Sequence, residues 1–433
     1  MHKSLHVLFI IYLFALVLSA EDTIREDRET SFRKSIDAFG KLDEKEVAGV
    51  KKFKQMFRNG EISGQVRSMY AAYKQKSPSE TDTYATALGG MFKYELANFN
   101  GFNAAIAVTG SQDLSFATGD TLESRHNDEL SSLKGNYIAM SEAYINYTDG
   151  SLNIRLGRQM IDTPLADTDD SRMIPNTFEA YMLTYEMDNI VFTLGNVQKW
   201  QGAGAGLGYN DAGVKLNDNW IDTEGSGTSM IGLSYLNALK FRAWYYDIQK
   251  SINASKASYF ELGYHKKGDI ALHGAIQYLH ESEAKNSGVQ ADIYGALVEL
   301  IIHNAGVNIA YNKSKKHQGK RSFSGIGGGS LYTSMDTMLL DEIAQDRDAS
   351  SLVAGFEYEI EKFKVIYAYG DFVGEADSLG NSVHIVEQNL GLEYTMEESF
   401  SLAAIYVKEE DKQSVAQTAN DWDRFQLMIA YNF

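Results

Sequence analysis

The chain ends in the stretch RFQLMIAYNF, residues 424–433, and this stretch decides the fold class. Every second residue in it is apolar or aromatic, namely Phe425, Leu427, Ile429, Tyr431 and Phe433. A period of two is typical of a β-strand whose two faces meet different surroundings. Because chain ends usually fray, a terminal strand this regular must be held on both sides. The pattern therefore predicts a closed barrel in which the last strand pairs with the first and faces lipid.

Alternation recurs from residue 61 onward, for example in EISGQVRSMYAAY (61–73), NGFNAAIAVTGSQ (100–112) and EKFKVIYAYGD (361–371). Eight short links join such stretches, at 97–101, 147–151, 185–189, 235–239, 264–269, 301–306, 358–362 and 394–399. Nine longer polar links alternate with them, at 74–82, 113–134, 162–177, 198–225, 249–255, 282–288, 313–349, 372–382 and 409–420. Short turns on one side and long loops on the other are features of bacterial outer-membrane barrels. Residues 60–433 are therefore predicted to form a closed antiparallel transmembrane β-barrel of about 18 strands, with short periplasmic turns and long external loops.

Most of the short links begin with a tyrosine, just before the turn itself, namely Tyr147, Tyr185, Tyr235, Tyr264, Tyr358 and Tyr394. Tyr94 lies a little earlier before its own link, and Tyr431 takes the corresponding place before the C-terminus. Tyrosine suits a boundary between apolar and polar surroundings, so the recurrence predicts an aromatic girdle. The high β-propensity of tyrosine is the alternative, but it does not account for the fixed position beside the turn. We also expect Tyr431 and Phe433 to form the assembly signal for the barrel-assembly machinery.

The N-terminus, MHKSLHVLFIIYLFALVLSA (1–20), has a basic start at Lys3, an apolar run and small residues at Ser19 and Ala20. That layout is typical of a secretory signal peptide. A single membrane anchor is the alternative, but the apolar run is shorter than the roughly 20 residues that a spanning helix needs. Residues 21–59 do not alternate, and their apolar residues fall at helix-like spacing among many charges. We expect a charged helical segment there, either periplasmic or plugging the barrel.

Composition narrows the function classes. The 433 residues include no cysteine, which excludes disulfides, zinc ribbons and thiol nucleophiles. The net charge of −18 becomes about −19 once Lys3 is removed, and a nucleic-acid partner is not expected because phosphate binding needs a basic surface. The nine histidines form no HExxH pair, and the glycine-rich stretches GAGAGLGYND and GIGGGS lack the spacing of a phosphate-binding loop. We therefore do not expect an enzyme.

Charged residues on the strand face opposite the large apolar side chains are predicted to line an aqueous lumen. The predicted lumen wall consists of Arg67, Glu142, Arg155, Glu357, Glu359, Glu387, Glu393 and Arg424. Its basic members lie mainly early and its acidic members mainly late, so Arg67 and Arg155 are expected to face carboxylates across the closure. Solvated wall residues without any solute preference are the alternative.

The link DTPLADTDDSRMIPNT (162–177) is the most distinctive of the long ones, because carboxylates crowd around one arginine and Pro164 and Pro175 stiffen the backbone. A rigid charged loop that enters a pore narrows it, and rings of charged side chains set ion selectivity. The predicted pore constriction consists of Asp162, Asp167, Asp169, Asp170 and Arg172. Asp167, Asp169 and Asp170 could instead hold a structural Ca²⁺ ion, although their spacing fits no known calcium loop. No other cofactor is expected.

Three stretches carry a family resemblance: FRNGEISGQVRSMYAAY (57–73), IRLGRQMIDTPLADTDDSRMIPNTFEA (154–180) and LYTSMDTMLLDEIAQDRDAS (331–350). They resemble the OprD-type porins, and among them the major outer-membrane porins of epsilon-class proteobacteria. The resemblance implies an 18-stranded barrel, usually trimeric, that passes small hydrophilic solutes. It also implies that the third long loop and a later one, here 162–177 and 313–349, constrict the channel. Family members that select carboxylates line the pore with arginines, whereas this sequence has few lumenal arginines beside many glutamates.

These observations lead to one main expectation about function. The protein is expected to be an outer-membrane porin for passive diffusion of small hydrophilic solutes and ions, with a mild cation preference. Its expected surroundings are outer-membrane lipid, lipopolysaccharide and two further copies in a homotrimer. A substrate-specific amino-acid or carboxylate channel and a surface-structural or adhesive barrel are the alternatives.

Overall fold

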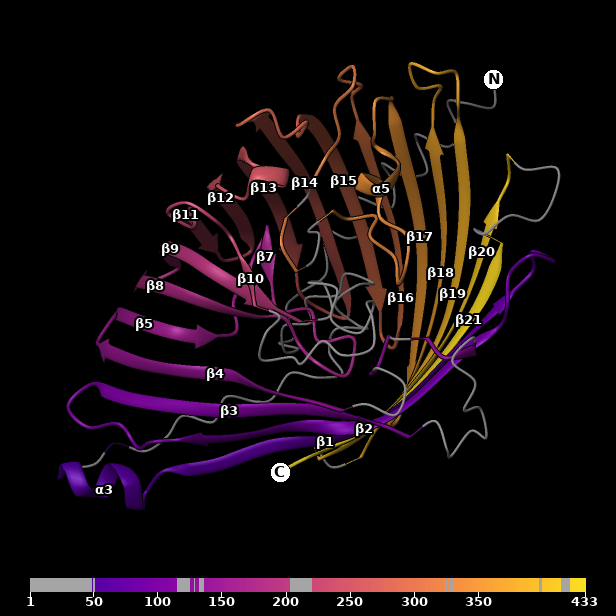
Figure 1. The fold of residues 1–433 in the computed structure, drawn as a ribbon. Helices are drawn as coiled ribbons and strands as arrows, with labels where there is room; N and C mark the ends of the chain where they lie inside the picture. Colours follow the sequence, from indigo (N-terminus) through magenta and orange to yellow (C-terminus); the bar gives the residue numbers. More distant parts are fainter. Residues whose placement is uncertain are drawn as a thin grey trace.

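Eighteen long antiparallel strands close into one barrel in the computed structural model, as the sequence predicts (Figure 1). The structure describes residues 49, 51–114, 125–127, 129–131, 136–202, 220–323, 325–327, 331–396, 399–413 and 421–433. The barrel strands are β1 (Glu61–Gln75), β2 (Thr83–Glu95), β3 (Phe102–Asp113), β4 (Asn136–Asp149), β5 (Leu152–Gln159), β8 (Thr177–Met187), β9 (Ile190–Gln201), β11 (Thr228–Leu236), β12 (Leu239–Ile248), β13 (Ser255–Lys266), β14 (Ile270–Glu283), β15 (Ala291–Ile302), β16 (Ala305–Ser314), β17 (Ala349–Ile360), β18 (Phe363–Gly374), β19 (Val383–Met396), β20 (Phe400–Asp411) and β21 (Trp422–Asn432). Shorter elements are α3 (Phe53–Arg58), β6 (Asp162–Thr163), β7 (Ala166–Asp167), β10 (Ile221–Asp222), the 3₁₀ turn Ser251–Asn253 and α5 (Leu340–Ile343).

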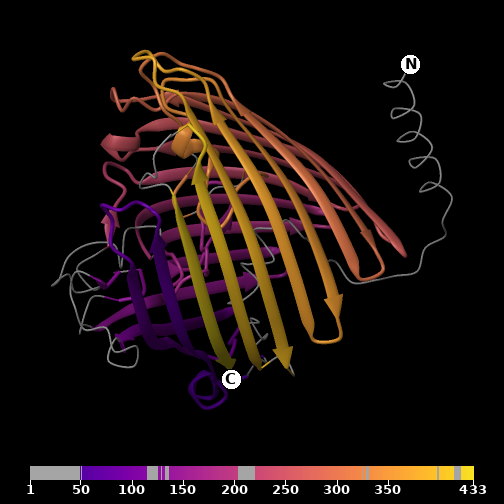
Figure 2. The same ribbon diagram turned by 90° about the vertical axis from the view of Figure 1, so that its right-hand side faces the viewer.

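The links between the strands agree with those predicted from the sequence. Each of the eight short links contains a turn between two consecutive barrel strands, and each of the nine long links contains a loop. Because consecutive barrel strands are antiparallel, the eight short turns fall at one end of the barrel and the strand ends that flank the long links fall at the other. Figure 2 shows the turns of the late strands together at one end. By the asymmetry of outer-membrane barrels, the turn end is periplasmic and the loop end is external.

The first and last strands form the seam that closes the barrel. β1 pairs antiparallel with β21, with Gln65 opposite Asn432. The backbones of Gly64 and Phe433 exchange two hydrogen bonds of 3.0 Å, so even the terminal residue is paired. The side chains of Tyr431, in β21, and of Phe433, directly after it, point outward and are about half exposed, whereas Arg424 is fully buried on the inner face. The interpretation of the C-terminal pattern as a closing strand is confirmed.

The two faces of each strand differ as expected for a barrel in lipid. On β1 the outward side chains Ile62 and Val66 are exposed, while the inward Gln65 and Arg67 are buried. Outward aromatics form cross-strand pairs near the short turns, such as Phe102 with Tyr147, whose ring centroids are 4.6 Å apart. Exposed apolar side chains on every strand are what a lipid-facing belt requires.

Three long loops bring residues into the lumen, and we call them L2 (114–135), L3 (160–176) and L7 (315–348). L3 contains the β6–β7 hairpin, and L7 contains α5. The two loops contact each other, because Ala166 of L3 bridges Ile326 of L7 and the Asn176 side chain donates to the Gly327 carbonyl at 2.8 Å. Their apolar side chains, such as Leu165 and Leu340, pack in one buried cluster with inward-facing wall residues of β8 to β19. The loops are therefore part of the folded core of the barrel.

The N-terminal predictions fall largely outside the described residues. These include the signal peptide at 1–20 and the helical segment at 21–59, except for its last part, where α3 lies beside the turn between β2 and β3. Within the part of the chain that the structure describes, no helix is long and apolar enough to cross a membrane, a result that does not bear on strands.

Candidate pore constriction

Arg67 of β1 links the barrel wall to L3. Its guanidinium makes a bidentate contact with the Asp170 carboxylate, at 2.8 and 2.7 Å, and both side chains are at least nine-tenths buried. Bidentate arginine–carboxylate pairs combine charge attraction with fixed geometry. Arg67 also donates to the Arg172 backbone carbonyl and to the Gln65 side chain. The Arg67–Asp170 pair therefore holds the part of L3 around Asp170 against β1, at the seam.

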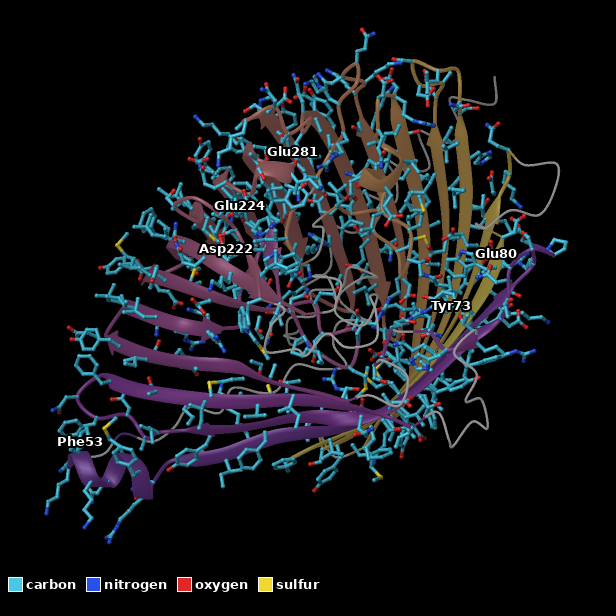
Figure 3. The ribbon with its side chains drawn as sticks, viewed as in Figure 1. Phe53, Tyr73, Glu80, Asp222, Glu224 and Glu281 are labelled. Atoms are coloured by element: carbon cyan, nitrogen blue, oxygen red, sulfur yellow. The ribbon has the colours of Figure 1, made fainter. Side chains whose placement is uncertain are left out.

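A second set of ion pairs joins all three loops to β21. The Arg424 guanidinium contacts the carboxylates of Glu129 from L2 and Asp336 from L7, and it lies 5.6 Å from the Tyr73 ring centroid. Arg172 of L3 binds the same Glu129 carboxylate at 2.8 Å. Figure 3 labels Tyr73 on β1, on the side of the barrel where the seam lies. We call Arg67, Arg172, Arg424, Glu129, Asp170 and Asp336 the seam cluster.

Burial of the seam cluster makes its pairing obligatory. Arg424 is fully buried, and the side chains of Glu129 and Asp336 are each only 2% exposed. An isolated charge in such a place would lose its hydration without compensation, so it needs a partner of opposite sign. The three arginines and three carboxylates balance one another, and their charges therefore largely cancel toward the pore.

Two further carboxylates lie on the wall beside the seam cluster, where they hold L7. The Glu387 carboxylate accepts hydrogen bonds from the Met338 backbone N–H at 2.7 Å and the Thr337 hydroxyl at 2.6 Å. Glu409 lies directly opposite Glu387 on β20 and contacts the same hydroxyl at 3.2 Å. Across the barrel, Glu281, labelled in Figure 3, accepts from the Ser322 hydroxyl at 2.8 Å and so fixes the start of L7. L7 is therefore held from two sides by wall carboxylates.

Charges nearer the short turns pair with other wall residues. Lys93 binds Glu142 at 3.2 Å, and Lys364 binds Glu357 at 2.7 Å. Lys364 lies between Glu359 and Glu393 on the neighbouring strands, directly opposite both. The Arg155 guanidinium stacks 4.4 Å from the Tyr144 ring centroid. We call this set the turn-side wall.

The remaining predicted constriction residues are in L3 but outside the seam cluster. Asp162 and Asp167 are opposite each other in the backbone register of the β6–β7 hairpin. Asp169 has a left-handed backbone with φ of 30°. The calcium alternative is not favoured, because the Asp170 carboxylate binds Arg67. Among the residues that the structure describes, no group of three or more acidic or histidine side chains is arranged to hold a metal ion.

The entry and exit of L7 are fixed by carboxylates that accept backbone hydrogen bonds. The Asp346 carboxylate accepts from the backbone N–H groups of Gly319 at 2.6 Å and Ser378 at 2.9 Å. Hydrogen bonds from Ser378, followed by that from Gly319, lower the pKa of Asp346 to about 2. Asp377 pairs with Arg347 at 3.1 Å, and hydrogen bonds led by the Asn381 backbone N–H lower its pKa. Both carboxylates therefore stay charged at neutral pH.

Sequence reasoning missed Glu129, Asp336 and Glu409. Glu129 and Asp336 belong to long loops, where no strand alternation tells which way a side chain points. The resemblance to OprD-type porins indicated that the loop 313–349 enters the channel, but not that Asp336 reaches Arg424 at the seam. Arg158 is a charged strand residue that does not face the lumen. It lies on the same face of β5 as the exposed Leu156, with its guanidinium 4.4 Å from the Trp220 ring centroid and 3.4 Å from the Glu179 carboxylate.

Comparisons with known proteins agree with this architecture. The sequence profile of the OprD family, described as outer membrane porin, matches residues 142–433. No curated protein sequence matched the chain. Similar solved structures include OccAB4 from Acinetobacter baumannii (18% identity, TM-score 0.70), OpdK from Pseudomonas aeruginosa with vanillate (14%, 0.69) and a BenF-like porin from Pseudomonas fluorescens Pf-5 (12%, 0.72). Each match covers 86% of this chain and 98% of the other, which establishes a shared fold.

Proposed function

The chain belongs to the OprD family of outer-membrane porins, and on that premise we propose that its pore passes small hydrophilic solutes and ions with a mild preference for cations. The family and the barrel make it a channel of the bacterial outer membrane. The cation preference goes beyond the family, and it rests on the charges of this chain.

The pairing of the three seam arginines is the observation that carries the proposal. Arg67, Arg172 and Arg424 are the groups that would favour anions, and each one contacts a carboxylate from a loop. The chain as a whole carries a net charge of −18, so the charge that remains once these arginines are paired is negative. Cations are favoured because fixed negative charge in a narrow aqueous pore raises their local concentration. The effect fades as the Debye length falls from about 10 Å at 0.1 M salt to about 3 Å at 1 M.

The constriction itself is part of the proposal. L3 and L7 occupy the lumen at the level of the seam cluster, and their contacts with each other and with the wall hold them there. We assign the narrowing to L3 near Asp170 and Arg172 and to L7 near Asp336. The other predicted constriction residues, Asp162, Asp167 and Asp169, contribute negative charge to the same loop.

Several finer assignments accompany this proposal. A closer kinship with the major outer-membrane porins of epsilon-class proteobacteria rests on the sequence stretches quoted above. Trimer formation, contact with lipopolysaccharide and recognition of the C-terminal strand by the barrel-assembly machinery rest on the family resemblance and on the outward pattern of β21. Export by the predicted signal peptide at 1–20 supplies the route.

Reversal potentials of the purified protein in planar bilayers test the proposal. In a KCl gradient near 0.1 M, we expect the potential that indicates cation preference, and a smaller value when the gradient is set near 1 M. Anion preference at low salt would overturn the cation assignment and favour the carboxylate-channel alternative. Inserted protein without conductance would favour the structural or adhesive alternative.

A further inference from the structure

The short helix α3 carries an exposed apolar face that none of the described residues covers. Phe53 and Phe57 are 62% and 54% exposed, although they are among the largest apolar side chains of the chain. Their rings contact each other edge to face, with centroids 5.7 Å apart. A contiguous exposed apolar patch with a polar rim marks a site of interaction with a protein or a membrane.

α3 is fixed in place by the barrel. Met56 is buried, and its backbone carbonyl accepts a hydrogen bond from the Ala97 N–H at 3.1 Å. The Tyr94 hydroxyl donates to the Phe57 carbonyl at 2.7 Å. A helix of six residues is too short to form alone in water, so these contacts to β2 and its turn determine its position. The face that carries Phe53 and Phe57 therefore has a defined orientation.

The exposed face continues the outward aromatic surface of the barrel. The Phe53 ring lies 6.0 Å from that of Phe99, which is bridged to Phe102, and Phe102 pairs with Tyr147 on β4. Phe102 is half exposed on the outer face at the short-turn end. Figure 1 shows α3 beside the turn between β2 and β3 at this end, and Figure 3 labels Phe53 at the margin of the molecule. The α3 rings therefore extend the lipid-facing belt at its periplasmic edge.

Basic side chains border this apolar face. Lys51, Lys52, Lys54 and Arg58 are all exposed, and no acidic residue occurs between residues 51 and 60. With 3.6 residues per turn, Phe53 and Phe57 share one side of α3, with buried Met56 on one flank and Lys54 and Arg58 on the other. An apolar face with a basic border is typical of helices that lie in the interface of a membrane with anionic lipid.

We propose that α3 docks on the periplasmic leaflet, with Phe53 and Phe57 among the acyl chains and Lys51, Lys52, Lys54 and Arg58 on the phosphates of anionic phospholipid. The commitment to lipid rests on charge complementarity and on the continuity of the α3 rings with the outward belt of β3 and β4. The site lies outside the lumen and does not depend on the ion selectivity proposed above.

Single cysteines can test the docking cleanly, because the chain has none of its own. Full-length Phe53→Cys and Phe57→Cys variants carry an environment-sensitive fluorophore in vesicles of phosphatidylcholine and phosphatidylglycerol. Ile62→Cys, on the outward face of β1, is the lipid-exposed control, and Leu379→Cys, 87% exposed between β18 and β19, is the water-exposed control. Phospholipids with brominated acyl chains should quench the labels at residues 53 and 57 nearly as well as the label at residue 62. Iodide in water should quench mainly the label at residue 379.

The charge of the leaflet supplies a second readout. With brominated phosphatidylglycerol in place of brominated phosphatidylcholine, quenching at residue 57 should rise, and combined Lys51→Gln, Lys52→Gln, Lys54→Gln and Arg58→Gln substitutions should abolish that difference. Quenching at residues 53 and 57 by iodide, as at residue 379, would overturn the proposal. Pyrene excimer emission from residue 53 without lipid quenching would place a second copy over the face and would equally overturn it.

Discussion

The seam cluster and the turn-side wall are both lined with charge, but they use it differently. In the seam cluster the wall arginines Arg67 and Arg424 find their carboxylates on L2, L3 and L7, across long stretches of sequence. In the turn-side wall Lys93 of β2 binds Glu142 of β4, which lies beyond β3 on the same wall. Lys364 of β18 binds Glu357 of the adjacent β17. Ion pairs in the seam cluster therefore fix the constriction loops to the barrel. Ion pairs in the turn-side wall connect wall residues only to one another. Substitutions in the two sets should therefore have different consequences.

Deletion of Phe433 should have the largest effect, because both the seam cluster and the turn-side wall depend on closure of the barrel. Phe433 is the last paired residue of the seam, through two backbone hydrogen bonds with Gly64, and without closure β1 and β21 would expose backbone groups to lipid. We expect the deletion, or Phe433→Asp, to reduce assembled barrel to a small fraction, as measured by heat-modifiable migration on unboiled gels. Leu379→Asp, in an exposed loop, is the matched control. Normal barrel levels from the deletion would contradict the assigned role of the terminal residue.

Arg424→Met should separate the two sets most sharply. The substitution leaves Glu129 and Asp336 buried without their shared partner, and breaking such a pair costs about 3 to 5 kcal/mol. We expect a clear drop in the temperature at which the folded band converts, together with noisier single-channel currents as the loops loosen. Lys364→Met, in the turn-side wall, is the comparison and should cost less, because it removes one ion pair between side chains that keep 14% and 12% of their surface exposed. Equal losses from the two variants would remove the distinction drawn here.

Leu165→Ala tests the apolar attachment of L3 opposite the seam. Leu165 is buried between L3, L7 and the wall, and its backbone N–H donates to the Tyr246 hydroxyl at 3.3 Å. Loss of a buried leucine costs about 3 kcal/mol when the cavity does not collapse. We expect L3 to open on that side while the Arg67–Asp170 pair persists, so that conductance increases and ion selectivity changes little. A large change in selectivity with unchanged conductance would contradict the assignment of pore width to the apolar attachment of L3 and of selectivity to the Arg67–Asp170 pair.

Acidification should break the hydrogen bonds that the Asp346 carboxylate accepts where L7 begins and ends. The pKa of Asp346 is lowered in the folded protein to about 2, so the stability that it contributes is present above its ordinary pKa and is lost as pH falls through about 2. We expect the backbone amides of Gly319 and Ser378 to lose protection from hydrogen exchange between about pH 4 and pH 2. Asp346→Asn should show the weaker protection already at neutral pH. If protection in the wild type does not change with pH, the Asp346 carboxylate does not hold the two ends of L7 in place.

Strand alternation and turn position were readable from the sequence because they are local. The pattern of β21 predicted the seam, and the short links predicted every turn, since period-two alternation reports which face each side chain occupies. The lumenal positions of Arg67, Glu387 and Arg424 followed in the same way. Their partners did not, because Asp336 and Glu129 lie in loops whose course is decided by packing over long sequence separations. The helix-like spacing of residues 21–59 predicted α3, but not that Phe53 lies beside Phe99.

The claim that loop carboxylates mask the seam arginines is tested most directly by the reversal potential of Asp170→Asn beside that of the wild type, in a KCl gradient near 0.1 M. Asp170→Asn leaves the Arg67 guanidinium without its bidentate carboxylate, so it exposes one positive charge at the constriction. The account predicts cation preference in the wild type and a shift toward anions in the variant, whereas Glu357→Gln in the turn-side wall shifts it less. Anion preference in the wild type, or no shift in Asp170→Asn, would contradict the account.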